Sequence, residues 1–114
     1  MRRAGRQAAV QLLYQLDATG DFDEPEEAGG LLFAHLTPDV TGEARRFAQA
    51  LGNGVALRRD EIDFLLEKAA DNWKLSRMSR VDRSILRVAV FELLDGQSPP
   101  RIVINEAVEL GKML

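Results

Sequence analysis

The sequence contains no cysteine and a single histidine, and these shortages exclude several classes of site. Without cysteine there is no disulfide, no thiolate nucleophile and no cysteine-ligated metal or iron–sulfur centre. His35 alone supports no catalytic set or metal site, and the glycines lack the spacing that cradles phosphates. We therefore expect neither an enzyme nor a bound metal or cofactor.

Long apolar runs are also missing. No stretch of about 18 apolar residues occurs, and the basic N-terminus is not followed by a signal-peptide segment. We therefore expect a cytoplasmic protein without a membrane segment. With 114 residues, 46% of them hydrophobic and 29% charged, the chain is typical of one compact domain covering residues 1–114.

The charge balance argues against indiscriminate nucleic-acid binding. The formal net charge is −3, whereas counterion release from nucleic acid needs many Lys or Arg residues that face phosphates. All but three of the 15 basic residues are Arg, which suits bidentate phosphate contacts and stacking on bases. We therefore predict one localised basic face on an otherwise acidic protein.

Apolar residues recur at helical spacing along most of the chain, which predicts an all-α fold. Gly52 and Gly54 leave open whether the middle of the chain forms two helices or one bent helix. Ser79 precedes a helix whose second half is almost wholly apolar, which is typical of the centre of a bundle. The expected helices are 2–17, 28–35, 41–55, 62–69, 79–94 and 101–114.

Two groups of arginines are candidate RNA contacts. The first lies within about a third of the circumference of the first helix, and its alternative is a solvated chain end. The second has i, i+3 and i+7 spacing, so its members share one line of a helix. Its alternative is ion pairing with carboxylates, for which Glu92 is one candidate. The groups are Arg2, Arg3 and Arg6, and Arg80, Arg83 and Arg87.

Three further side chains are candidates for binding or packing. Tyr14 lies off the apolar face of the first helix, so we expect partial exposure, at an interface or against a neighbouring helix. Trp73 is interpreted as a core anchor. Asp82 stands three residues after Ser79, where a capping box places its acidic member.

Several segments, taken together, resemble the NusB family in order and spacing. The opening Arg2-Arg3-x-x-Arg6, followed by Leu13-Tyr14-Gln15, is similar to the start of that family. The remaining matching segments are Trp73-Lys74-Leu75-Ser76-Arg77-Met78, Val81-Asp82-Arg83-Ser84-Ile85-Leu86-Arg87, Phe91-Glu92-Leu93-Leu94 and Val103-Ile104-Asn105-Glu106-Ala107-Val108-Glu109-Leu110.

The resemblance implies two small packed helix bundles and a function in transcription antitermination. In that function the protein and the ribosomal protein NusE bind boxA RNA in ribosomal RNA leader transcripts, and RNA polymerase then elongates past terminators. By position, Tyr14 and Asp82 match residues that face NusE. The positions matching the family's RNA contacts are Arg2, Arg3, Arg6, Arg80, Arg83 and Arg87.

The sequence departs from the family pattern at two places. Ala4 and Gly5 stand where the family is often more basic, so we expect weaker RNA binding. The family's final helix, which contains a Phe-Val-Asn-Gly motif, is expected to be absent after Leu114.

Two alternatives remain at this point. One is the NusB-like domain of a ribosomal RNA cytosine methyltransferase, which would continue into a nucleotide-cofactor domain. The other is a helical adaptor or homodimer without RNA binding, in which a partner chain covers apolar surface at Ile104, Ala107 and Val108. Salt-dependent RNA binding distinguishes the adaptor from an antitermination factor.

Overall fold

The computed structural model describes residues 2–69 and 74–114, and within these ranges it contains helices and connecting turns but no strand. The predicted all-α class is therefore confirmed. Trp73, which we interpreted as a core anchor, lies outside the described residues. The elements are α1 (Arg2–Thr19), α2 (Pro25–His35), α3 (Gly42–Leu57), α4 (Arg59–Ala69), the short 3-10 turn η1 (Leu75–Arg77), α5 (Arg80–Asp95) and α6 (Pro100–Met113).

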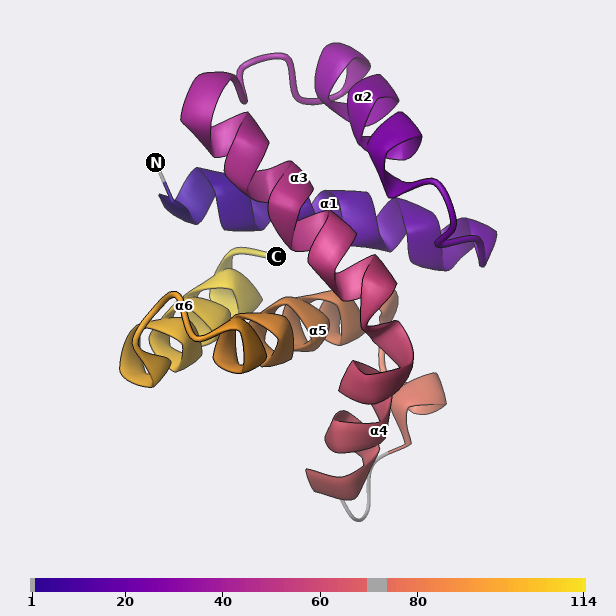
Figure 1. Cartoon of the computed structure of the whole chain (residues 1–114), viewed down its shortest axis with the longest axis vertical. Coiled ribbons are helices and arrows are strands. Elements are labelled where there is room, and N and C mark those ends of the chain that lie inside the picture. The colour runs from indigo at the N-terminus through magenta and orange to yellow at the C-terminus, as the bar shows by residue number, and fades with distance from the viewer. Residues whose placement is uncertain (1, 70–73) are drawn as a thin grey trace.

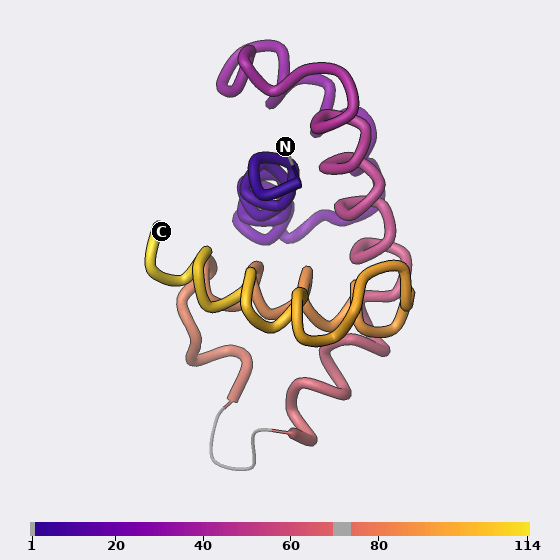
Figure 2. Tube along the Cα trace, turned by 90° about the vertical axis from the view of Figure 1, so that its left-hand side faces the viewer, coloured from indigo at the N-terminus to yellow at the C-terminus, as the bar shows by residue number. Residues whose placement is uncertain are grey.

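Helix α1 lies between two groups of helices. Figure 2 views α1 nearly end-on, with α2 and α3 above and beside it and with α5 and α6 below it. Contacts join α1 to α2, α3 and α5, whereas α4 packs on α3, α5 and η1 (Figure 1). The first three helices and the last three thus form the two small bundles that the family resemblance implied.

The apolar face predicted for α1 forms the centre of the core. Ala9, Leu12 and Leu13 are fully buried, and Leu16 is only 4% exposed. Opposite them, a side chain at Gly52 would collide with Leu12, so glycine at this position lets α3 approach α1 closely. This close approach explains why a helix-weakening residue is found inside α3.

The middle of the chain forms two helices. Helix α3 ends at Leu57, and the backbone amide of Arg58 donates to the carbonyl oxygen of Gly54 at 3.1 Å. Arg58 leaves the helical conformation, with φ −107° and ψ 20°, and α4 begins at the next residue. The chain turns there, so α4 packs against α5 without extending the line of α3 (Figure 1).

Helix α5 begins and ends where the sequence predicts. The Ser79 hydroxyl accepts a hydrogen bond from the backbone amide of Asp82 at 3.1 Å, which confirms the predicted N-terminal cap. Gly96 ends the helix with a positive φ of 73°, and Pro100 is the first residue of α6. Because α5 contacts α1, α3, α4 and α6, its predicted central position is also confirmed.

The outer helices α2 and α6 leave part of their apolar residues exposed. In α2, Leu32 is buried, but the neighbouring Leu31 is 60% exposed. In α6, Val103 and Leu110 face the core, whereas Ile104 and Val108 are more than half exposed. A helix that packs against neighbours on one side only leaves part of a wide apolar stripe uncovered.

None of the helices in the described ranges combines the length and apolarity needed to cross a membrane.

Candidate nucleic-acid interface

The first turn of α1 places two arginines at the surface. Arg2 is exposed, and its guanidinium lies over the ring of Phe47 in α3, 4.2 Å from the ring centroid. The side chain of Arg3 is 51% exposed and donates to the carboxylate of Glu106 in α6 at 2.8 and 3.1 Å. Both guanidinium groups can therefore be reached by a ligand from solvent.

Arg6, which belongs to the same predicted group, is buried. Its Nε and Nη2 atoms donate to the two carboxylate oxygens of Glu92 in α5, at 2.8 and 2.9 Å. The side chains are only 5% and 6% exposed. The hydrogen bond to Glu92 raises the pKa of Arg6, against the opposing effect of burial. Arg6 thus joins α1 to α5 and cannot bind a phosphate without breaking this pair.

The carboxylate of Glu106 lies between Arg3 and Arg6 of α1. Arg3 is its hydrogen-bond partner, and Nη1 of Arg6 lies 3.8 Å from its Oε1 atom. The hydrogen bond from Arg3 lowers the pKa of Glu106, with smaller contributions from the charges of Arg3 and Arg6. This carboxylate therefore holds the start of α1 against α6.

Arg83, in the second predicted group, is held by internal partners. Its Nε donates to Oδ2 of Asp17 in α1 at 2.8 Å, and its Nη1 donates to the backbone carbonyls of Leu75 and Met78 at 3.2 Å. The side chain is 14% exposed. One guanidinium group therefore ties the 3-10 turn and α5 to α1.

Arg87 makes an internal network of the same kind. It donates to both oxygens of Asp63 in α4 at 2.9 and 3.0 Å, and also to Asp17 at 3.3 Å, and it is 6% exposed. Ion pairing, the alternative left open by the sequence, is thus what the structure shows for this residue. The suggested partner Glu92 was wrong, because both oxygens of Glu92 accept hydrogen bonds from Arg6.

Arg80 differs from the two arginines that follow it on the same line of α5. It is exposed in the first turn of the helix, and it forms no ion pair with any side chain that the structure describes. Of the second predicted group, Arg80 is therefore the member that a phosphate can reach.

The two arginine groups lie at opposite ends of the α1–α5 pair. Arg6 of α1 meets Glu92 near the end of α5, whereas Asp17 of α1 meets Arg83 near its start, so the two helices are antiparallel. At 1.5 Å per residue, the distance along α1 between these two contacts is roughly 17 Å. The predicted single basic face is thus divided in two.

Tyr14 and Asp82 are both exposed, near the second of these ends. Tyr14 is 38% exposed, which confirms the partial exposure expected from its place off the apolar face. The ion pair between Asp17 and Arg83 brings the C-terminal half of α1 to the first turn of α5, which contains Asp82. Both residues thus belong to segments that the Asp17–Arg83 pair brings together.

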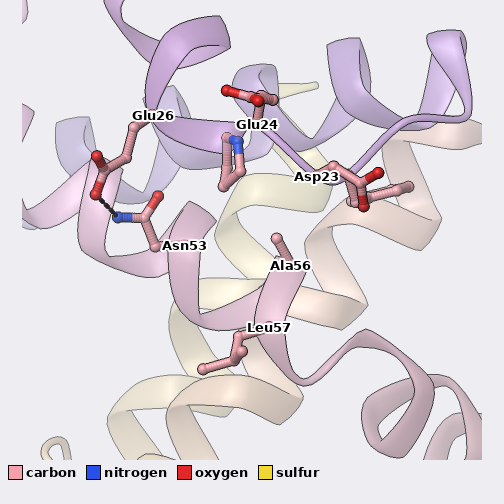
Figure 3. Close-up of a pocket in the computed structure, with 8 residues that line it drawn as sticks. Asp23, Glu24, Glu26, Asn53, Ala56 and Leu57 are labelled. Carbon is pink, nitrogen blue, oxygen red and sulfur yellow. Dashed lines mark hydrogen bonds between the residues drawn. The ribbon is translucent and has the colours of Figure 1, made fainter.

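A cleft of about 550 Å³ separates the start of α2 from the end of α3 (Figure 3). Its walls include the carboxylates of Asp23, Glu24 and Glu26, and the amide of Asn53 donates to Glu26 at 3.2 Å. Acidic walls repel phosphate, so this cleft is not suited to a nucleic-acid backbone. Within the described ranges, no three His, Asp or Glu side chains are placed to hold a metal ion.

Sequence reasoning missed a smaller cleft beside Arg2. The cleft measures about 300 Å³ and lies where α1, α3, α5 and the α5–α6 turn meet. The ring of Phe47 in α3 is partly exposed beneath Arg2. No local pattern marks this cleft, because its walls come from four separate segments. Its lining includes Arg2, Phe47, Phe91, Asp95, Gln97 and Ser98.

Comparison with known proteins places almost the whole chain in one family. The model of the NusB family matches residues 3–114. The transcription antitermination protein NusB of Myxococcus xanthus is 48% identical over 113 residues, covering 97% of this chain and 80% of that protein. The NusB of Geobacter sulfurreducens is 43% identical over 114 residues, covering 97% and 79%.

Solved structures show the same helical fold. The NusB of T. maritima superposes with a TM-score of 0.79 and 31% identity, covering 99% of this chain and 78% of that one. A chain in a crystal structure described as a plectonemic RNA supercoil gives a TM-score of 0.82 with 28% identity, covering 96% and 78%. The family match, the named relatives and the shared fold agree. The chain belongs to the NusB family of transcription antitermination proteins.

Proposed function

We propose that this chain acts in antitermination by binding boxA RNA of ribosomal RNA leader transcripts together with the ribosomal protein NusE. It would do so as part of an RNA polymerase antitermination complex in the cytoplasm. The observation that carries the RNA part of the proposal is the exposed pair Arg2 and Arg3 at the start of α1. The function requires binding alone, without a catalytic step.

The electrostatics of the first turn of α1 support a phosphate contact. The ion pair between Arg3 and Glu106 is partly exposed, and such pairs contribute little to stability, so Arg3 can turn to a phosphate at small cost. Arg2 is placed over an aromatic ring, which restricts its motion before RNA binds. A net charge of −3 disfavours non-specific binding of the whole surface to RNA, so RNA binding is confined to the exposed arginines.

Within the second group, Arg80 is proposed as a direct RNA contact. Arg83 and Arg87 are proposed to act indirectly, because their guanidinium groups are already held by Asp17 and Asp63. These two arginines fix the position of the first turn of α5, which presents Arg80.

NusE is proposed to bind where α1 meets the start of α5. Tyr14 supplies a partly exposed aromatic ring with a polar hydroxyl, a residue type that is enriched in protein interfaces. Asp82 supplies an exposed carboxylate in the same region. The RNA and protein surfaces are therefore proposed to extend along the α1–α5 pair.

A titration of labelled boxA RNA, with and without purified NusE, tests this function. We expect boxA RNA to bind more tightly than a scrambled RNA, and NusE to increase the difference. Tyr14→Ala and Asp82→Ala should reduce the NusE effect while leaving binding of RNA alone unchanged. Glu67→Gln, an exposed change in α4, is the control. Equal affinity for both RNAs, whether or not NusE is present, would overturn the proposal.

An adaptor or homodimer without RNA binding is the second candidate. The observation in its favour is the exposed apolar face of α6, where Ile102, Ile104 and Val108 are 46%, 57% and 53% exposed. A second copy of the chain could cover this face. Sedimentation equilibrium distinguishes the two. A dimer that Ile104→Glu dissociates, in a protein that does not bind RNA, would favour this candidate.

A further inference from the structure

We propose that the cleft beside Arg2 is a binding site for one unpaired base of single-stranded RNA. The inference rests on the proposed RNA-binding function and deepens it, because it names the part of the RNA that enters the protein. The cleft measures about 300 Å³, at the lower end of the range of small-molecule sites. That size suits one base and excludes a duplex.

One wall of the cleft is suited to stacking. The guanidinium of Arg2 lies 4.2 Å from the ring centroid of Phe47, and both side chains line the cleft. Arginine planes and aromatic rings are the groups on which proteins stack unpaired RNA bases. Since Phe47 already holds Arg2 in place, little side-chain freedom remains to be lost when a base enters.

The inner wall is formed by Phe91, and the backbone of α3 is built to receive it. A side chain at Gly54 would collide with the Phe91 ring, so this ring lies directly against the helix backbone. Gly5 of α1 likewise lets the ring of Phe47 pack against a helix backbone, because a side chain at Gly5 would collide with that ring. The two aromatic walls are thus held by close backbone packing.

The polar rim favours a base over a phosphate. Asp95 lines the cleft, and its carboxylate repels an anion, whereas the carboxylate of Glu92, also in the lining, is paired with Arg6. Both oxygens of Glu92 are occupied by Arg6, which leaves Asp95 as a hydrogen-bond acceptor, with Gln97 and Ser98 beside it in the α5–α6 turn. A base edge that carries N–H donors, such as that of guanine, can bind this rim. The phosphates on either side of that base would then meet the solvent-facing arginines of α1.

The experiment compares short boxA RNAs in which each nucleotide in turn lacks its base. We expect one abasic position to weaken binding about tenfold or more, as the loss of one stacked base does. Phe47→Leu should weaken binding of the intact RNA by a similar factor. It should have little further effect on the RNA that lacks the critical base. This loss of additivity locates that base in the cleft.

Two rim variants keep the test independent of folding, because Phe47 also packs against α1. Asp95→Asn and Gln97→Ala change exposed side chains, so they should leave the melting temperature unchanged. We expect both variants to weaken binding of the intact RNA and to leave binding of the abasic RNA unchanged. Glu67→Gln should change the affinity for neither RNA.

The outcomes separate this inference from the function on which it rests. If boxA RNA binds but no single abasic position matters, the base site is wrong and the function stands. The same conclusion follows if the rim variants weaken intact and abasic RNA equally. If no RNA binds at all, both the base site and the proposed function are wrong.

Discussion

Arg6 and Glu92 form a buried ion pair through two parallel hydrogen bonds, at 2.8 and 2.9 Å, which joins the start of α1 to the last turns of α5. The family resemblance placed Arg6 among the RNA contacts. Its position in the structure indicates a different role, because the pair holds together the two helices that carry the proposed RNA surface.

We predict that Arg6→Ala lowers the free energy of unfolding by about 3–5 kcal/mol, because it leaves the carboxylate of Glu92 buried and without its partner. Urea unfolding measures this loss. The double variant Arg6→Met with Glu92→Leu should recover much of it, since replacing both partners leaves no isolated charge. An Arg6→Ala protein of normal stability with lost RNA affinity would instead show that Arg6 contacts RNA directly.

The network of Arg87 gives a second prediction. Arg87→Ala should lower the free energy of unfolding by about 3 kcal/mol, because Asp63 and Asp17 lose a buried cation. Arg80→Ala should leave stability unchanged and weaken RNA binding, since Arg80 is exposed. Thermal unfolding and RNA titration of both variants separate the two roles. If both variants lose RNA affinity alone, the line of arginines on α5 binds phosphate as one stripe.

The ion pair between Glu106 and Arg3 predicts that the stability of the protein depends on pH in the acidic range. Arg3 lowers the pKa of Glu106 below its ordinary value of 4.5, mainly through a hydrogen bond to the charged form. The stabilisation is therefore fully present above pH 4.5 and is lost as the pH falls through the lowered value. The wild type should exceed Glu106→Gln in stability at neutral pH, and the difference should shrink in acid. A difference that stays constant from neutral pH into acid would contradict this assignment.

Gly54 predicts a packing effect. Gly54→Ala should gain up to about 1 kcal/mol of helix propensity but lose about 1–3 kcal/mol, because the new methyl group collides with the Phe91 ring. A net loss of stability is expected. Gly30→Ala in α2 is the matched control. A side chain at Gly30 would meet open space, so this variant should not lower the stability of the protein. A stabilising Gly54→Ala would mean that Phe91 moves away easily.

Much of the fold was predictable because its signals are local. The apolar face of α1 and the cap at Ser79 each depend on residues close together in the sequence. The turn at Arg58 was not resolved by periodicity, because the same spacing continues in α3 and α4. Only the contacts of α4 with α5 show that the chain bends there.

The candidate site was predicted less completely, because burial of a charged residue depends on a partner far along the chain. Arg6 and Arg3 cannot be distinguished by residue type. In the structure, Arg6 is buried in a pair with Glu92, whereas Arg3 stays half exposed. The separation of Arg2 from Arg80 likewise follows from the antiparallel packing of α1 and α5, which helix spacing alone does not contain. The cleft beside Phe47 needs four segments to meet.

The most direct test of the account is the salt dependence of boxA RNA binding for the wild type and for the variant Arg2→Ala with Arg3→Ala. Each lost phosphate contact should reduce the slope of log affinity against log salt concentration by about one unit. The slope of the double variant should therefore be smaller than that of the wild type by up to about two units. Its helix content should stay close to that of the wild type, and its melting temperature should fall only slightly, because the Arg3–Glu106 pair that it loses is partly exposed. An unchanged slope and affinity in a folded double variant would contradict the claim that the first turn of α1 binds RNA.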